Sequence, residues 1–171
     1  MEFSVEAVGS IDNCFVSLPL PLIQTLQSTA SSSLPPILAL HLRSPTHPPH
    51  SWFVAWSGAT SSSSSTIQVS QQFAECVSLP IHSPVQVKVA SNVPHASSVS
   101  IEPDTEDDWE ILELNSEQAE NQILNQVRIV HEGMRFPLRL NGHTVITFHV
   151  ASVFPKNAVG KNYYAYCLLH I

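Results

Sequence analysis

Apolar and polar residues alternate along several short segments of the chain, and this period of two predicts β-strands. Alternate residues of ILALHLR, residues 37–43, and of WFVAW, residues 52–56, are large and apolar, so each segment presents one apolar face. The polar loop SPTHPPHS between them predicts that the two segments pair as antiparallel strands. Further strands are predicted at residues 14–18, 66–69, 85–90, 99–102, 136–140 and 144–153.

Apolar residues spaced by three or four positions predict helices between these strands. In LPLPLIQTLQS, Ile23 and Leu26 line one side of a helix that begins near two prolines. A short helix is expected at residues 71–77. Another helix is expected after a cap at Asn115 or Ser116, with an apolar side formed by Ala119, Ile123 and Val127.

An acidic helix is predicted for TEDDWEILEL, residues 105–114. Thr105 can cap the free amides of the first turn, where carboxylates favour the positive end of the helix dipole. Trp109, Leu112 and, less directly, Ile111 are expected on one side, with Glu110 and Glu113 on the other. Tryptophan is enriched at partner-binding hot spots, but it more often fixes a helix to a sheet, so we expect Trp109 in the core.

The order of these elements predicts two lobes. Residues 1–93 read as a small mixed β-barrel, the turn-forming SNVPH marks the junction, and residues 94–160 read as a smaller, mostly β lobe with a helical insert. An Asn-Gly dipeptide at residues 141–142 predicts a hairpin turn in the second lobe. The serine run 61–65 is expected to be a mobile loop, and residues 161–171 an atypical tail.

Composition narrows the classes of function. Hydrophobic residues make up 43% of the chain, which is enough for a core, and the net charge of -7 disfavours binding to phosphate backbones and anionic membranes. The acidic amino terminus lacks the basic flank of a secretory signal, and no apolar run approaches the roughly 20 residues needed to cross a bilayer. A protein on the cytosolic side is expected.

We find no catalytic, cofactor-binding or metal-binding motif in the sequence. The pair His47 and His50 lacks a nearby cysteine or carboxylate to complete a metal site. There is no nucleophile-elbow sequence, and glycine is too scattered for a phosphate-binding loop. Adjacent helical carboxylates point in different directions, so the acidic helix offers no convergent acid–base pair. His41, His143 and His149 are expected within strands, in hydrogen-bonded structural roles. Buried, reduced packing roles are expected for Cys14, Cys76 and Cys167.

Several motifs resemble the amino-terminal domain of the type-one AAA-family peroxin, the peroxisome-biogenesis ATPase. The specific part is DDWEILELNSEQAENQILNQVRIVHEGMRFPLRLNGHTVITFHVASVFP, residues 107–155. DNCFVSLP, WFVAWSG, VKVASNVP and VSIEPDTEDDWE resemble successive parts of the plant members, so the match spans about residues 10–160. The chain resembles a form truncated before the ATPase modules, and its tail after Val159 replaces the expected last strand.

This resemblance implies a mixed α/β, mainly β, two-lobed p97-type N-domain: a double-psi β-barrel followed by a small β-barrel lobe with a helical insert. It implies a non-catalytic adaptor- or substrate-binding domain in peroxisome biogenesis, matrix protein import and receptor recycling. Expected partners are a protein adaptor or a ubiquitinated import receptor and, for the full-length family, a second AAA peroxin, with ATP and Mg bound outside this chain. The expected location is the cytosol and the cytosolic face of the peroxisomal membrane.

Two surfaces are candidates for the partner. The first is the groove between the lobes, beside residues 92–95, with the serine loop outside it. The alternative is a phosphoinositide-binding or membrane-surface module that uses basic residues of the second lobe, although its basic charge is sparse. Those residues are Arg128, Arg135, Arg139 and Lys156.

Overall fold

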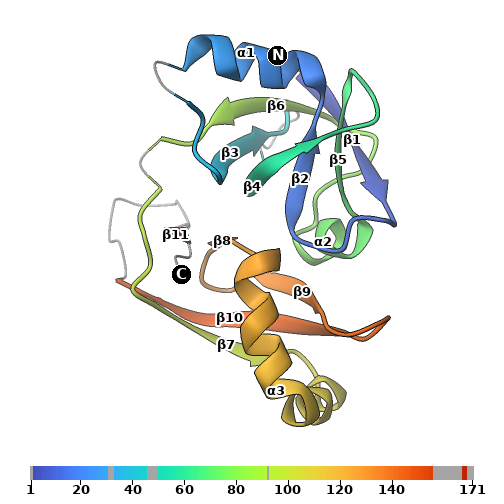
Figure 1. Ribbon diagram of the computed structural model, residues 1–171, viewed down its shortest axis with the longest axis vertical. Helices are drawn as coiled ribbons and strands as arrows, with labels where there is room; N and C mark the ends of the chain where they lie inside the picture. Colours follow the sequence, from blue (N-terminus) through green and yellow to red (C-terminus); the bar gives the residue numbers. More distant parts are fainter. Residues whose placement is uncertain (1, 31–32, 46–49, 92, 156–166, 169–171) are drawn as a thin grey trace.

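The computed structural model describes residues 2–30, 33–45, 50–91, 93–155 and 167–168 of the chain. Two lobes lie one above the other along the long axis, and a connection at the side joins them (Figure 1). The mixed, mainly β fold class predicted from the sequence is confirmed, with a closed barrel in the first lobe and a smaller second lobe.

The first lobe is a closed six-stranded barrel with the strand order β1-β5-β2-β4-β3-β6. Parallel pairs, β1 with β5 and β2 with β4, mix with antiparallel ones, as expected for a double-psi topology. Its elements are β1 (Glu2–Val8), β2 (Phe15–Leu18), α1 (Leu20–Thr29), β3 (Leu38–Arg43), β4 (Ser51–Thr60), β5 (Thr66–Ser70), α2 (Gln71–Cys76) and β6 (Pro84–Val89).

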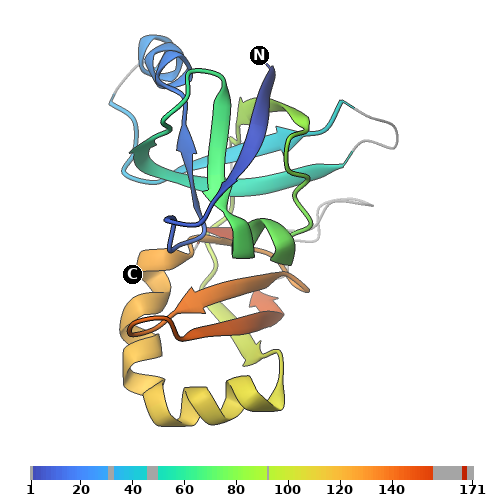
Figure 2. The same ribbon diagram turned by 90° about the vertical axis from the view of Figure 1, so that its right-hand side faces the viewer.

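The second lobe has a three-stranded antiparallel sheet in the order β7-β10-β9. The long helix α3 runs beside this sheet, as Figure 2 shows from the side. Its elements are β7 (Ser98–Pro103), α3 (Glu106–Gln126), β8 (Ile129–Val130), β9 (Arg135–Arg139), β10 (Val145–Phe154) and β11 (Cys167–Leu168). One buried apolar cluster includes residues of both lobes, so the lobes share a continuous core.

The predicted pairing of residues 37–43 with 52–56 is confirmed. Leu42 lies opposite Trp52, and Leu40 lies opposite Val54. Leu40 and Leu42 are fully buried and Val54 almost so, because their common face points into the barrel. The period of two therefore indicated both the strands and the side that faces the core.

Strand β1 was not predicted from the sequence, although Phe3 and Val5 alternate with polar residues and are both buried. β1 pairs in parallel with β5 and antiparallel with β6. Because these partners lie more than fifty residues away, only the tertiary structure shows that β1 closes the barrel.

The serine run 61–65 forms a loop between β4 and β5, as predicted, and hydrogen bonds attach it to the barrel. Ser61 is buried, and its backbone N–H donates to the Leu18 carbonyl on β2 at 2.8 Å. The Gln68 side chain donates to the Ser62 hydroxyl at 2.7 Å and accepts from the Ser62 backbone N–H at 3.1 Å. These hydrogen bonds fix the connection that carries β4 across to β5.

The two predicted helices of residues 105–127 form the single kinked helix α3. The Thr105 hydroxyl accepts from the Asp108 N–H at 3.1 Å, so the predicted cap is confirmed. Asn115 has non-helical backbone angles, φ -135° and ψ 24°, and marks the predicted boundary. Its side chain donates to the Ile111 carbonyl at 2.8 Å, which satisfies an acceptor that the kink would otherwise leave open.

The predicted burial of Trp109 is wrong. The side chain is 48% exposed, while Ile111 and Leu112 pack against the core. Since successive helical residues are about 100° apart, a core side centred between Ile111 and Leu112 turns Trp109 toward solvent. The helix is amphipathic as expected, and Ile111 and Leu112 lie on its apolar side, but Trp109 lies outside that side.

Replacing Trp109 with alanine is therefore expected to cost about 1 kcal/mol of unfolding free energy or less, well below the 3 to 5 kcal/mol typical of a buried tryptophan. Alanine also has a high helix propensity, which partly offsets the lost contacts. Urea unfolding followed by circular dichroism would measure the difference. A loss above about 3 kcal/mol would restore the core assignment.

Part of the tail forms a strand. Within residues 161–171, Cys167–Leu168 form β11 and pair antiparallel with β8, while the replacement of the last strand of the second lobe stays a prediction. The rest of that segment lies outside the described residues. The predicted hairpin turn is confirmed, since Gly142 has a φ of +64° between β9 and β10.

Candidate partner-binding groove between the lobes

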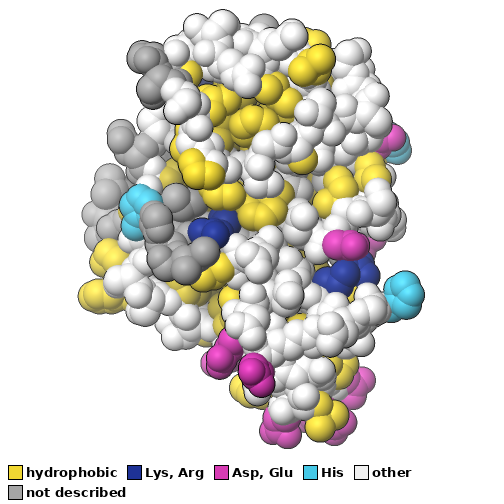
Figure 3. All heavy atoms as spheres, viewed as in Figure 1, with side chains coloured by type: hydrophobic (Ala, Val, Ile, Leu, Met, Phe, Trp, Pro, Cys, Tyr) yellow, Lys and Arg dark blue, Asp and Glu magenta, His cyan; other side chains and the backbone are white. Residues whose placement is uncertain are grey.

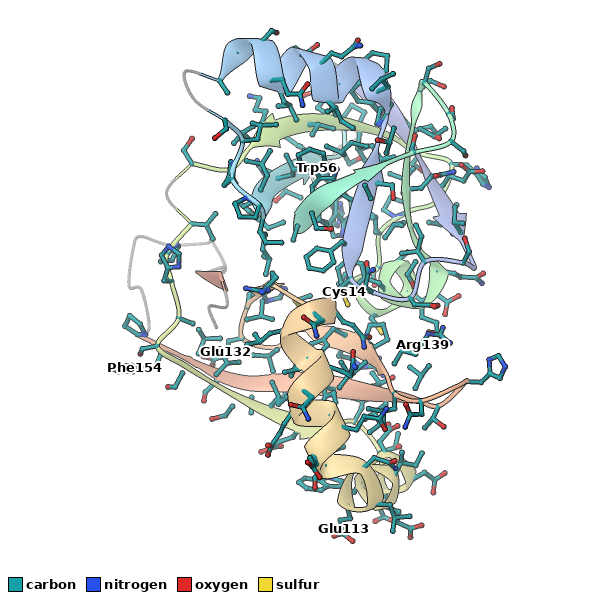
Figure 4. All side chains as sticks on the ribbon, viewed as in Figure 1. Cys14, Trp56, Glu113, Glu132, Arg139 and Phe154 are labelled. Atoms are coloured by element: carbon teal, nitrogen blue, oxygen red, sulfur yellow. The ribbon has the colours of Figure 1, made fainter. Side chains whose placement is uncertain are left out.

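Direct contacts hold the two lobes in one arrangement. The Cys14 N–H, before β2, donates to the Gln126 carbonyl at the end of α3 at 2.8 Å. The Arg139 Nε of β9 lies 3.0 Å from the Asp12 Oδ1 of the first lobe, an ion pair without hydrogen-bond geometry. Figure 4 shows Cys14 and Arg139 at the level where the lobes meet. An apolar cluster of Phe15, Ala55 and Ile129 also joins the outside of the barrel to β8.

The buried Gln126 side chain connects α3 to β9. Its Nε2 donates to the Arg139 carbonyl at 2.7 Å, and its Oε1 accepts from the Arg139 N–H at 2.8 Å. The role of Gln126 was not predicted from the sequence. A polar residue beside the apolar Val127 was the only available signal, and its partners depend on the tertiary structure.

A groove with a volume of about 250 Å³ opens between the lobes. The barrel contributes the start of β4 and the end of α2, and the second lobe contributes the segment that leads into β9. Figures 1 and 2 show α2 on the side of the barrel that faces the second lobe. The lining residues are Ser51, Trp52, Phe53, Cys76, Val77, Ser78, His131, Gly133, Met134 and Arg135.

Aromatic residues on β4 form the barrel wall of the groove. The Trp52 Nε1 donates to the Val77 carbonyl at 3.1 Å, which fixes the indole against the end of α2. The Phe53 ring stacks on His41 of β3, with 4.6 Å between ring centroids and 18° between ring planes. Both rings are half-buried, so the wall is rigid but keeps some apolar surface accessible.

The opposite wall carries the positive charge of the groove. Arg135, at the start of β9, makes a bidentate pair with Asp104, in which the Nε–Oδ1 distance is 3.1 Å. The Arg135 side chain is still 50% exposed. Before it, Gly133 has a φ of +83°, a left-handed conformation in which its N–H donates to the Val150 carbonyl at 2.9 Å. This turn directs Met134 and Arg135 along the groove wall.

The titratable groups of the groove are uncharged at neutral pH, apart from Arg135. Burial lowers the pKa of His131, although a hydrogen bond from its Nδ1 to the Glu132 carbonyl opposes the shift. Burial raises the pKa of the Cys76 thiol, opposed by the nearby Arg135 cation. A protonated thiol is a poor nucleophile.

The lowered pKa of His131 predicts a pH dependence of stability. Because the unfolded histidine binds a proton more readily than the folded one, stability is lost as the pH falls through the ordinary histidine pKa of about 6.5. A His131→Asn variant is expected to lose less unfolding free energy than the parent chain between pH 7.5 and pH 5. Urea titrations of both proteins at each pH would measure this, and identical pH slopes would contradict it.

The groove lies between the lobes, as the sequence analysis predicted, but its lining does not include the hinge. Residues 93–95 are absent from the described lining, and Asn92 lies outside the described residues. The serine loop 61–65 is likewise absent from the lining. Sequence order suggested the hinge because it joins the lobes, whereas the groove forms where β4 and α2 approach β9.

The histidines fall at separate places in the fold. His47 lies outside the described residues, while His50 stacks on Trp52 with 6.3 Å between centroids. Within the described ranges, no three His, Cys, Asp or Glu residues come close enough to hold a metal ion. His143 belongs to the hairpin turn, which corrects the expectation that it lies within a strand.

The arginines of the alternative membrane surface have acceptors within the protein. Arg135 pairs with Asp104, and Arg139 lies beside Asp12. The Arg128 Nε donates to the Leu124 carbonyl at 2.6 Å, and Lys156 lies outside the described residues. Two of these three arginines are thus next to carboxylates, which weakens their attraction for anionic headgroups.

A family comparison identifies the second lobe. Residues 97–163 match the family model described as "Peroxisome biogenesis factor 1, N-terminal". This part of the chain belongs to the peroxisome biogenesis factor 1 N-terminal family. The match begins just before β7 and continues past β10, so it includes α3 and the groove wall formed by His131, Gly133 and Arg135.

Individual relatives extend the similarity across the barrel. The chain is 30% identical to Peroxisomal ATPase PEX1 of Dictyostelium discoideum over 93% of its length, and 26% identical to that of Homo sapiens over 87%. Peroxisomal ATPase PEX1 of Saccharomyces cerevisiae is 30% identical over 91% of the chain. The predicted resemblance to the amino-terminal domain of a type-one AAA peroxin is thereby confirmed, while the likeness to plant members stays a prediction.

The chain spans only a small part of these relatives: 14% of the Dictyostelium protein, 11% of the human and 15% of the yeast. The similarity is to the amino-terminal region of the peroxin and not to its catalytic module. Among the described helices, none has the length and apolar character required to span a bilayer.

Proposed function

We propose that this chain is a non-catalytic adaptor- or substrate-binding domain of a peroxisomal AAA ATPase, and that the groove between its lobes receives the protein partner. The main support is the combination of family membership with a preformed groove that presents aromatic and cationic groups but no activated nucleophile. A volume of about 250 Å³ is below the roughly 300–1,000 Å³ of small-molecule sites, so it suits an anchoring side chain of a protein better than a metabolite.

In this proposal the barrel, residues 1–93, and the second lobe, residues 94–160, act together, because each supplies one wall of the groove. The exposed part of Arg135 would attract an acidic or carbonyl-rich partner segment, and Trp52 and Phe53 would contact its apolar anchor. The direct contacts between the lobes keep the walls at a fixed spacing, which lowers the entropy cost of binding.

The family suggests what the partner does. The names of the relatives place them at the peroxisome, so we propose a role in peroxisome biogenesis, matrix protein import and receptor recycling, on the cytosolic side of the membrane. The partner would be an adaptor or a ubiquitinated import receptor. ATP and Mg would act in ATPase modules outside this chain, beside a second AAA peroxin.

A groove-filling substitution tests the proposal. Ser51 is exposed at the edge of the groove. Ser51→Tyr should therefore place a ring in the space that the anchoring side chain of the partner would occupy, and leave the core intact. We expect it to weaken saturable binding of a recombinant import receptor or adaptor by about tenfold or more, as hot-spot losses do. Isothermal titration calorimetry with the full chain would measure the change.

The matched control is Ser28→Tyr on α1, an exposed serine outside the groove lining. It should leave the dissociation constant within about twofold, as surface changes away from an interface do. The proposed groove would be rejected if both variants bound like the parent chain. The proposed adaptor role would be rejected if the parent bound neither receptors nor adaptors.

A further inference from the structure

The first segment of α3 leaves one side without a partner in the described structure. Placing residues at 100° intervals puts two large apolar side chains and four carboxylates within one half of the helix. We call this surface the α3 acidic face: Glu106, Asp107, Trp109, Glu110, Glu113 and Leu114. All six side chains are exposed. Figure 3 shows acidic and apolar side chains together at the end of the molecule farthest from the barrel, and Figure 4 marks Glu113 there.

The orientation of this face is fixed by the opposite side of the helix. Ile111 and Leu112 pack against the core, and Thr105 caps the helix through the Asp108 N–H. Neither contact could be kept if the helix rotated to bury Trp109. The exposure of Trp109 therefore follows from the way α3 packs in the lobe and does not result from a loosely attached end of the helix.

The apolar members of the face are large and strongly exposed. Trp109 is 48% exposed and Leu114 is 86% exposed. Single exposed apolar residues are common, but a tryptophan and a leucine on one rigid helical face provide the anchors typical of protein interfaces. The remaining large exposed hydrophobics of the described residues, Leu20, Val89 and Phe154, lie on other elements.

The charge of the face defines its partner. α3 carries seven of the fourteen acidic residues of the chain and no lysine or arginine. In the described ranges, the four carboxylates of the face make neither a hydrogen bond nor an ion pair with another side chain, whereas Asp12 and Asp104 are already paired with arginines. We propose that the α3 acidic face docks a basic amphipathic protein segment, with its apolar side chains on Trp109 and Leu114 and its lysines or arginines beside the carboxylates.

The same charges disfavour other occupants. A second copy of the chain would bring two sets of carboxylates together, and nucleic acids and anionic lipids would be repelled. A cation of the partner could also lie over the exposed Trp109 ring, a contact that arginine makes well. This surface goes beyond the proposed groove, since none of its residues lines the groove and the two have opposite charge character.

The test uses the full chain and a defined probe. The probe is a synthetic helical peptide with a leucine and phenylalanine stripe flanked by lysine and arginine. One control peptide keeps the stripe but carries glutamate in place of the basic residues, and another keeps the basic residues but carries serine in the stripe. We expect the probe to bind saturably and the control peptides not to do so. Binding of the probe should weaken as the salt concentration rises from 50 to 500 mM, because exposed charges are then screened.

Variants locate the binding. Trp109→Ser is expected to weaken the affinity for the probe about tenfold or more. The double variant Glu110→Gln/Glu113→Gln is expected to weaken it about threefold to tenfold at low salt. The barrel control Glu2→Gln/Glu75→Gln removes the same charge elsewhere and should change the affinity less than about twofold. Thermal melting of each variant would show that the fold is kept. Ser51→Tyr should also leave probe binding unchanged, which separates this surface from the groove.

The proposal is overturned if the probe does not bind saturably, if it binds equally well to the parent and to Trp109→Ser, or if both control peptides bind as tightly as the probe. It is also overturned if sedimentation shows a dimer of the chain that Trp109→Ser dissociates, because the face would then serve self-association. A groove that fails to bind receptors would not affect this result.

Discussion

Replacing Phe136 with alanine is expected to lower the free energy of unfolding by about 3 to 5 kcal/mol. Phe136 lies on β9 and is 1% exposed, and its ring stacks on Phe148 of β10 with 5.7 Å between centroids. Alanine would remove this contact and leave a cavity where β9 meets the shared core. Urea unfolding at constant pH, followed by circular dichroism, would measure the loss.

Phe154→Ala provides the matched control for this prediction. The chemical change is the same, but Phe154 is 64% exposed at the end of β10, so little apolar surface is lost from the interior. We expect a cost of less than about 1 kcal/mol, within the range of strand propensities. Equal losses for the two phenylalanines would mean that the second lobe does not pack as described.

Replacing Gln126 with alanine is expected to cost about 2 to 4 kcal/mol, because both backbone groups of Arg139 would lose their partner in a buried position. The effect should extend beyond the second lobe. The Gln126 carbonyl accepts from the Cys14 N–H of the first lobe, and the Arg139 side chain lies beside Asp12. A shift of Gln126 would therefore disturb both contacts between the lobes.

Gln126→Glu keeps one of the two side-chain hydrogen bonds of this residue and removes the other. A carboxylate can still accept from the Arg139 N–H but cannot donate to the Arg139 carbonyl, so we expect a loss comparable to that of alanine. The neighbouring Asn125→Ala is the surface control, since Asn125 is exposed and its side chain donates to the Asn121 carbonyl of its own helix. Hydrogen exchange of the Cys14 amide would report directly on the lobe contact. Unchanged exchange and stability in Gln126→Ala would contradict the assigned role.

Much of the barrel could be predicted from local pattern. The strands at residues 37–43 and 52–56 alternate strictly, and their register follows from which residues face the core. The cap at Thr105 and the kink at Asn115 are local as well, because each depends on groups within four residues. Such features need only short-range hydrogen bonding and side-chain periodicity, which the sequence displays directly.

The candidate site could be predicted only in outline. The sequence indicated a groove between two lobes, yet it pointed to the hinge instead of the walls made by Trp52, Cys76 and Arg135. These residues are distant along the chain, and no motif links them. The exposed surface around Trp109 was not predicted for a related reason. Trp109 was expected to be buried, and only the packing of Ile111 and Leu112 against the core decides which side of the helix is exposed to solvent.

The sequence by itself determined the family, the mainly β class, most strands and the Thr105 cap of α3, because these follow from local periodicity, turn chemistry and specific motifs such as DDWEILEL. Tertiary structure alone decided that β1 closes the barrel, that Gln126 joins α3 to β9 and that Trp109 faces solvent. The physical reason is that each of these depends on partners brought together from distant parts of the chain, whose contacts are absent until the lobes have packed.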